Sequence, residues 1–313
     1  MNKIAFLFPG QGSQSLGMMS ELAESSPLIK DVFGQASAVL GFDLWQLCQQ
    51  GPEESLNQTA NTQPAMLAAG YATWQLWLEQ GGAVPDMFAG HSLGEYTALV
   101  AAGSITFEDA VRTVALRGRL MQKAAPEGIG AMAAILGMDD DDLARICVQA
   151  AQGEVVSCAN FNAPGQVVIA GHRSAVERAC EAARDAGARR AIVLPVSVPS
   201  HCLLMKPAAD ELSAALDGVE IRPPAPDVLQ NADVEAYSSS GDIRDALARQ
   251  LWQPVRWTET VTKLSEQGVT RFIECGPGKV LAGLNRRIDR NAEVFALTDS
   301  AAIRAAMGDG EDE

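Results

Sequence analysis

The sequence contains little histidine and no paired cysteine motif, and both scarcities limit its chemistry. Only three histidines occur among 313 residues, so proton transfer by an imidazole depends on His91, His172 or His201. None of the six cysteines forms a C-x-x-C pair, and a chain of this length needs no disulfides to fold. We therefore expect a reduced protein located in the cytoplasm.

Long apolar runs and an excess of positive charge are also missing. No stretch approaches the about 20 apolar residues that cross a bilayer, since Gly70 and Gln75 interrupt the richest one, residues 65–78. Asp and Glu number 39 against 24 Lys and Arg, which gives a formal charge of −15. An acidic surface repels phosphate backbones, and this argues against nucleic acids and anionic membranes as partners.

The composition is that of a globular protein with a sizeable core. Apolar residues make up 47% and charged residues 20% of the chain, which is typical of folded proteins. At about 150 residues per domain, the length predicts two domains, or one large domain with an insertion.

Short apolar runs that alternate with helical patterns predict an α/β fold. Residues 4–8 and 87–89 are expected as buried strands, each followed by a glycine-containing turn. Helical patterns cover residues 20–48, 64–79, 95–102, 107–122, 201–216, 243–250 and 258–267, and further strands are expected at 227–230 and 271–274. Strand, sharp turn and helix form the unit of a parallel sheet covered by helices. We predict a discontinuous large domain, α/β-hydrolase-like, from residues 1–127 and 198–307.

Residues 128–197 follow a different pattern and predict a small inserted domain. The expected order is strand, helix, strand, strand, helix, strand, at residues 131–137, 140–151, 155–160, 167–170, 173–186 and 191–196. This order is that of the ferredoxin-like split unit. The last residues, 308–313, have the sequence GDGEDE and are expected to form an acidic tail.

The segment GHSLG at residues 90–94 matches the G-x-S-x-G pattern in the setting that the pattern requires. An apolar strand precedes it and a helical pattern follows it. The flanks of a nucleophile on such a tight turn are crowded, so glycines are needed on both sides of Ser92. The backbone N–H of Leu93, at the start of the helix, would point to where an oxyanion develops. The alternative is a chance match in a tight turn.

A serine nucleophile needs a base, and elimination leaves His201. His91 is adjacent to Ser92, so its side chain should point away, and His172 follows a polar turn where a surface position is expected. His201 follows a segment whose prolines prevent a helix, and it begins a helical pattern. The positive end of that helix would keep the imidazole neutral and able to accept a proton. A capping or core histidine is the alternative.

The order of these residues departs from that of ordinary α/β-hydrolases. Those enzymes place an Asp or Glu after the serine and a histidine near the C-terminus. Here about a third of the chain follows His201. A backbone carbonyl or an amide is therefore a candidate to orient the imidazole in place of an acid.

Two further polar residues stand where they could bind negative charge. Gln11 lies in a glycine-rich turn that lacks the third glycine of a dinucleotide site and the lysine of a P-loop, so we expect it to donate to the oxyanion. Arg117 lies at the edge of the apolar stripe of its helix and is expected to be half-buried. Such an arginine needs an anion, and its planar fork suits a carboxylate. A surface ion pair is the alternative.

These motifs together resemble those of malonyl-CoA–acyl carrier protein transacylases of bacterial type II fatty acid synthesis. The likeness runs nearly from end to end. It is carried by FPGQGSQ (8–14), GHSLGEYTAL (90–99), ALRGRLMQ (115–122), NAPGQVVIAG (162–171), PVSVPSH (195–201), RQLWQPVRW (249–257) and GPGKVL (276–281).

The resemblance implies a mechanism with an acyl-serine intermediate. Ser92 would attack the thioester of malonyl-CoA with His201 as the base, while the backbone N–H groups of Gln11 and Leu93 hold the oxyanion. After CoA leaves, the phosphopantetheine thiol of acyl carrier protein would take the malonyl group, which gives ping-pong kinetics. The product would supply fatty acid chain elongation.

The resemblance also implies roles for three other residues. Arg117 would pair with the malonyl carboxylate, and the backbone carbonyl of Gln250 would orient His201 in place of the missing acid. Asn162 would contact the substrate. No metal ion and no cofactor apart from the substrates is implied.

Three alternatives stay open at this point. In related modular polyketide synthases, serine before the histidine accompanies methylmalonyl and phenylalanine accompanies malonyl, and this chain has Ser200 there. A serine esterase or thioesterase would form the same acyl-serine on Ser92, although it would need no carboxylate-binding arginine. A non-catalytic subunit of an acyl-transfer assembly is the third alternative, and the presence of nucleophile, base and arginine together weighs against it.

Overall fold

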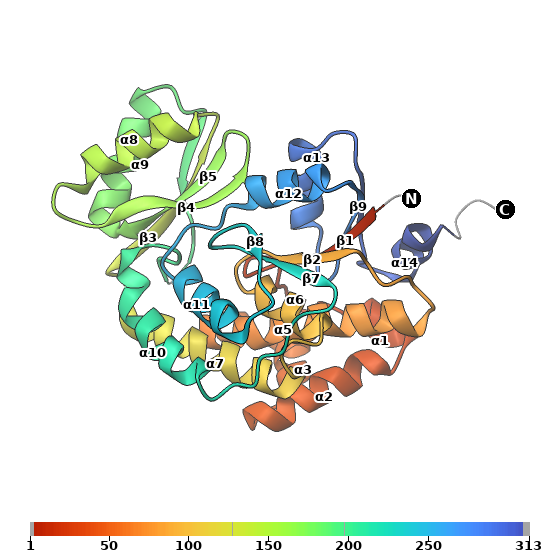
Figure 1. Ribbon diagram of the computed structural model, residues 1–313. Helices are drawn as coiled ribbons and strands as arrows, with labels where there is room; N and C mark the ends of the chain where they lie inside the picture. The colour runs from red at the N-terminus through yellow and green to blue at the C-terminus, as the bar shows by residue number, and fades with distance from the viewer. Residues whose placement is uncertain (1–2, 127, 197, 309–313) are drawn as a thin grey trace.

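Two sheets organise the structure, a computed structural model that describes residues 3–126, 128–196 and 198–308 (Figure 1). The larger sheet has six strands in the order β10-β9-β1-β2-β7-β8. They are β1 (Lys3–Phe8), β2 (Met87–Gly90), β7 (Asp227–Gln230), β8 (Glu235–Ala236), β9 (Val269–Glu274) and β10 (Glu293–Ala296). Neighbouring strands pair in parallel, except that β8 is antiparallel to β7. The predicted α/β fold is confirmed, with a mixed sheet that is mainly parallel.

Alternation along β1 divides the apolar core between the two faces of this sheet. Phe6 and Phe8 belong to one buried cluster, whereas Ala5 and Leu7 belong to another. The first cluster packs against α1 (Ser20–Ser25), α2 (Leu28–Leu40), α3 (Leu44–Gln50), α4 (Glu53–Leu56), α5 (Thr59–Glu79), α6 (Gly94–Ala101), α7 (Phe107–Ala124), the 3₁₀ turn η1 (Leu203–Met205), α10 (Lys206–Leu216), α11 (Ser240–Gln250) and α14 (Ser300–Met307). The second packs against α12 (Trp257–Glu266) and α13 (Val280–Ile288), on the opposite side of the sheet in Figure 1. Both faces are covered, as a parallel sheet requires.

The smaller sheet has four antiparallel strands in the order β4-β5-β3-β6. They are β3 (Gly130–Leu136), β4 (Val156–Ala163), β5 (Gln166–His172) and β6 (Arg190–Val193). One face packs against α8 (Asp140–Ala151) and α9 (Arg173–Asp185) around a core of its own. The other face contributes Met132 and Val168 to a cluster with Cys202. Cys202 belongs to the part of the molecule built around the larger sheet, called the large part below; the part built around the smaller sheet is called the small part. Backbone hydrogen bonds from β4 to Val255 also join the two parts.

Several predicted boundaries were wrong, and local backbone chemistry explains the differences. The pattern at 20–48 is three helices, because α2 begins after Pro27 and ends at Gly41, whose φ is 79°. The helix predicted at 201–216 starts later, because His201 has a φ of 61° and α10 begins at Lys206. The strand predicted to reach residue 196 ends at Val193. The helices α13 and α14 and the strand β10 were not predicted.

Some expectations fall outside the described part of the chain. The predicted domain boundaries at residues 127 and 197 lie there, as do residues 309–313 of the predicted acidic tail. Within the described ranges, no helix has the length and apolar character to cross a membrane. The same ranges hold no group of three or more His, Cys, Asp or Glu side chains that could ligate a metal ion.

Candidate active site

Ser92 stands on the sharp turn between β2 and α6, in a backbone conformation that few residues adopt. Its φ is 53°, in the left-handed region where a side chain is strained. The glycines on either side permit the turn by close packing. A Cβ on Gly90 would lie 1.9 Å from the carbonyl carbon of Gly94, and one on Gly94 would lie 1.9 Å from the oxygen of Phe8. The turn can therefore close against β1 only with glycine at both positions.

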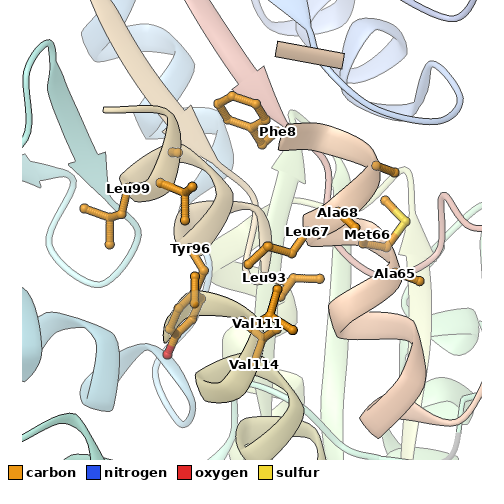
Figure 2. Packing of buried hydrophobic residues seen from close by; sticks show 14 of the residues in the cluster. Phe8, Ala65, Met66, Leu67, Ala68, Leu93, Tyr96, Leu99, Val111 and Val114 are labelled. Atoms are coloured by element: carbon orange, nitrogen blue, oxygen red, sulfur yellow. The ribbon is translucent and has the colours of Figure 1, made fainter. Parts of the chain in front are cut away.

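Leu93 fixes the peptide that follows the nucleophile. Its side chain is buried, and Figure 2 shows it beside Leu67 and Val111. Across residues 3–126, 128–196 and 198–308, no internal hydrogen bond uses the backbone N–H of Leu93 or of Gln11. Both residues line the same cleft, so the two donors are available to an oxyanion.

His201 lies between Ser92 and Gln250 in a hydrogen-bonded chain. Its Nε2 is 2.7 Å from Ser92 Oγ, and its Nδ1 is 2.8 Å from the backbone oxygen of Gln250. A carbonyl oxygen only accepts hydrogen bonds, so the proton of the neutral ring belongs on Nδ1. Nε2 is then the acceptor for the hydroxyl proton of Ser92. The carbonyl of Gln250 occupies the place that an acid holds in ordinary hydrolases.

The protonation state of His201 is set by burial and by a neighbouring charge. Burial, and next the positive charge of Arg117, lower the pKa of His201 to about 3. The imidazole is thus neutral at neutral pH and able to accept a proton. The prediction that a helix dipole keeps His201 neutral was wrong. The residue precedes a 3₁₀ turn of only three residues, and α10 begins only at Lys206.

Arg117 is fully buried rather than half-buried as predicted, with 1% of its surface exposed. Its Nη1 donates to Gln63 Oε1 and its Nη2 to Gln250 Oε1, both at 2.9 Å, and Nη2 also lies 3.3 Å from Ser92 Oγ. These oxygen atoms are all neutral, and Nε finds no partner within the described residues. Burial lowers the pKa of Arg117, an effect that the neighbouring Tyr96 and Glu95 oppose. A buried guanidinium whose direct hydrogen-bond partners are all neutral is a binding site for an anion.

The other two histidines lie away from the hydroxyl of Ser92, as predicted. His91 Nε2 is 2.8 Å from Asn162 Oδ1, and burial lowers the pKa of this ring. Asn162, which was predicted to contact the substrate, lines the cleft. Its side-chain oxygen is already hydrogen-bonded to His91 of the nucleophile turn, which we define as residues 90–94. His172 accepts a hydrogen bond from the backbone N–H of Val155 and holds a turn of the small sheet.

Three buried polar residues of the site were missed by sequence reasoning: Gln63, Glu95 and Asn231. Gln63 positions Arg117 from α5. Asn231 Oδ1 accepts from the N–H of Ser92 at 2.7 Å, and Glu95 Oε2 accepts from the N–H of Asn231 at 2.7 Å. Burial raises the pKa of Glu95 to about 7, against the lowering effects of Asn231, Gln250 and Arg117. The only sign of these residues in the sequence is that each is a polar residue beside apolar ones. Such a pattern does not indicate which distant residue the side chain will contact.

These residues open into a cleft of about 980 Å³ between the two parts of the molecule. The large part supplies the reacting groups, and the small part supplies a mostly apolar wall. The residues of that wall are Met132, Asn160, Asn162, Val168, Leu194, Pro195 and Val196. Ser200 also lines the cleft, beside His201. The volume is that of a site for a drug-sized molecule, far larger than a three-carbon acyl group needs.

Comparison with known sequences gives matches over nearly the whole chain. The model of the acyl transferase domain family matches residues 5–298. The chain is 55% identical to the malonyl CoA-acyl carrier protein transacylase of Escherichia coli strain K12 over 307 residues, which is 98% of this chain and 99% of that protein. It is 47% identical to the protein of the same name from Bacillus subtilis strain 168, over 98% of this chain and 97% of that one.

Solved structures agree with the fold in detail. An acyl carrier protein S-malonyltransferase from Vibrio cholerae O1, 56% identical, superposes with a TM-score of 0.95 over 97% of this chain and 99% of its own. A malonyl-transacylase solved in complex with a holo type II PKS acyl-carrier protein is 54% identical. It superposes with a TM-score of 0.97 over 99% of this chain and 100% of its own.

Proposed function

The chain belongs to the acyl transferase domain family, and from this premise we propose that Ser92, His201 and Arg117 carry out malonyl transfer. The chain transfers the malonyl group of malonyl-CoA to the phosphopantetheine thiol of acyl carrier protein, for fatty acid chain elongation. One observation carries the residue assignment. The hydroxyl of Ser92 lies 2.7 Å from a neutral imidazole nitrogen and 3.3 Å from a buried guanidinium nitrogen.

Acylation begins when Ser92 Oγ attacks the thioester carbonyl and His201 Nε2 accepts the hydroxyl proton. The backbone N–H groups of Leu93 and Gln11 stabilise the oxyanion. The carbon–sulfur bond then breaks, and the imidazolium of His201 gives its proton to the departing CoA sulfur. The carbonyl of Gln250 holds the Nδ1 proton throughout and stabilises the imidazolium. A malonyl ester on Ser92 remains.

The second half-reaction repeats these steps in reverse with a different thiol. His201 accepts the proton of the pantetheine thiol, and the sulfur attacks the ester carbonyl. Collapse of the second oxyanion returns the proton to Ser92 Oγ and releases malonyl-carrier protein. Because CoA and carrier use the same site in turn, the kinetics are ping-pong.

Arg117 selects the acyl group and also tunes the base. The free carboxylate of malonyl pairs with the guanidinium, which the free protein holds among neutral oxygen atoms. The positive charge of Arg117 is one of the causes that lower the pKa of His201. A bound carboxylate offsets that charge and makes His201 a stronger base at the moment of attack. Acyl groups without a carboxylate leave the base weak, so selectivity acts on the chemical step as well as on binding.

We further propose two structural domains with an acidic tail, and a reaction that needs no metal ion or cofactor. The large part, residues 1–127 and 198–307, is α/β-hydrolase-like, and the strand–Ser92–helix turn supports this. Residues 128–197 are a ferredoxin-like domain, supported by the strand order β4-β5-β3-β6. Residues 308–313 are an acidic tail. No metal ion and no cofactor apart from the substrates takes part, and Asn162 lies against the bound acyl chain.

A transfer assay tests the function against a serine hydrolase that uses the same Ser92. Malonyl-CoA is incubated with the protein, with and without holo acyl carrier protein, and CoA release and carrier mass are followed together. We expect stoichiometric malonyl-carrier protein, and CoA release that stops after one equivalent per enzyme when carrier is absent. Steady CoA release without carrier would identify a hydrolase.

A further inference from the structure

Asn231 connects two points of the nucleophile turn, residues 90–94. It follows β7, the strand next to β2 in the large sheet, and is completely buried. Its Oδ1 accepts from the N–H of Ser92 at 2.7 Å, and its Nδ2 donates to the carbonyl oxygen of Gly90 at 2.7 Å. One side-chain amide thus holds the backbone at the nucleophile and two residues before it.

A carboxylate on the other side of the turn holds Asn231 in place. Glu95 lies in the first turn of α6, completely buried, and its Oε2 accepts from the backbone N–H of Asn231 at 2.7 Å. Its Oε1 finds no hydrogen-bond partner within the ranges that the structure describes. A buried carboxyl group with one unused oxygen is costly to a fold, so its placement here needs a reason.

The conformation of Ser92 supplies that reason. A φ of 53° is strained for a residue with a side chain, and it persists only where the surroundings over-determine it. Two contacts hold the Ser92 peptide groups from distant segments: Asn231 binds its N–H, and Gln250 Nε2 donates to its carbonyl oxygen at 2.8 Å. Because Asn231 occupies the N–H of Ser92, the oxyanion is left to the N–H groups of Leu93 and Gln11.

We propose that Asn231, anchored by Glu95, is a positioning residue that holds Ser92 in its strained, reactive conformation. The inference rests on the proposed function for its role in malonyl transfer. Asn231 acts through the backbone and touches neither the substrate nor the reacting oxygen. Its loss would let the turn relax and carry Oγ away from His201 Nε2 and from the oxyanion donors, which lowers the rate of attack without removing any reacting group.

The test measures the reactivity of Ser92 by two routes. A fluorophosphonate that modifies activated serines reports the nucleophile whatever the natural substrate is, and rapid-quench acylation by malonyl-CoA reports the proposed reaction. Asn231→Ala should slow both by about 10- to 100-fold, a loss typical of a misplaced reacting group, and should leave KM for malonyl-CoA nearly unchanged. Glu95→Leu should slow both in the same way, whereas Glu95→Gln, which keeps an acceptor oxygen, should stay close to wild type.

Asn285→Ala is the matched control for lost stability. Asn285 is also a buried amide, and its Oδ1 accepts from Trp257 Nε1 at 3.0 Å. The ring of Trp257 lies 5.5 Å from that of His91, so Asn285 is one side chain removed from the nucleophile turn. We expect this variant to unfold at a lower temperature while its folded fraction labels at the wild-type rate. Asn231→Ala that loses stability as Asn285→Ala does, but labels at the wild-type rate, would overturn the proposal. Wild-type protein that labels with the fluorophosphonate but not with malonyl-CoA would instead count against the proposed function alone.

Discussion

The two sheets of the molecule contribute to the cleft in different ways. In the large part, Ser92 follows strand β2 of the parallel sheet, His201 precedes η1 and Arg117 lies on α7, and these three segments meet within hydrogen-bond distance. The antiparallel sheet offers mainly apolar side chains together with the amides of Asn160 and Asn162, and Asn162 contacts the nucleophile turn through His91. The proposed chemistry is thus concentrated in one part, and the shape of the cleft depends on both.

Burial and charge differ between the two parts as well. The large part holds a buried cation, a buried carboxyl group and a buried imidazole close together: Arg117, Glu95 and His201. The small part keeps its charged groups outside its own core, which consists of apolar residues and cysteines. The shifted pKa values of these three groups meet where catalysis is proposed, and such a cluster is expected of an active site.

Removing the base should have the largest effect among these comparisons. His201→Ala leaves Ser92 without a proton acceptor, so we expect kcat for malonyl transfer to fall by about 10²- to 10⁴-fold with little change in KM. Steady-state kinetics with malonyl-CoA and holo carrier measure this. His172→Ala, which removes a histidine of the small sheet, is the control and should keep wild-type kcat. A similar loss in both variants would contradict the division between the two parts.

Removing the buried cation should reduce malonyl transfer and relax the choice of acyl group. Arg117→Ala is expected to cost malonyl transfer about 2 to 5 kcal/mol, the scale of losing one partner of a buried charge pair. Acetyl transfer should lose much less, since acetyl has no carboxylate. Competition between malonyl-CoA and acetyl-CoA gives the ratio of kcat/KM directly. Arg119 is an exposed arginine on the same helix, so Arg119→Ala serves as the control. Equal losses for malonyl and acetyl transfer would rule out the pairing of Arg117 with the malonyl carboxylate.

The pH dependence of acylation should show the depressed pKa of His201. The acid limb of kcat/KM reports the base in the free enzyme, and here burial and Arg117 lower its pKa from 6.5 to about 3. The neutral form therefore persists as the pH falls, and we expect no loss of rate near pH 6.5. Arg117→Ala removes one lowering cause and should move the acid limb upward. Brief pH-jump assays avoid unfolding, and a wild-type limb centred near 6.5 would show that His201 is not buried as described.

The smallest effect is expected where the small sheet touches the nucleophile turn. Asn162→Ala removes the partner of His91 and should lower kcat/KM for malonyl-CoA less than about tenfold, the scale of one hydrogen bond. Steady-state kinetics beside Arg117→Ala make the comparison. A loss equal to that of Arg117→Ala would show that the small part shares directly in the chemistry.

Local patterns predicted much of this molecule. Ser92 and Leu93 were predicted together with the strand, turn and helix that hold them. This was possible because the apolar run, the GHSLG turn and the helix are neighbours in the sequence. The elimination of His91 and His172 left His201 with no need for tertiary information. The alternation of strands and helices likewise predicted both sheets, because hydrophobic period is a local property.

The features that were not predicted depend on contacts between distant segments. Arg117 was expected at the edge of an apolar stripe, but Gln63 from α5 and Gln250 from α11 enclose it. Glu95 and Asn231 are 136 residues apart, and nothing near either one indicates the other. The left-handed backbone of His201 also depends on packing and not on residue type.

The most direct test of the account is the mass of the intact protein after brief exposure to malonyl-CoA, acetyl-CoA or methylmalonyl-CoA. The account predicts a malonyl adduct that survives in water, leaves when holo carrier is added, and is absent from Ser92→Ala. Methylmalonyl should label more slowly despite Ser200, and acetyl much more slowly still. Burial raises the pKa of Cys202 to about 11, so that thiol should not take over in Ser92→Ala. An adduct that persists in Ser92→Ala, or no adduct in the wild type, would contradict the central claim.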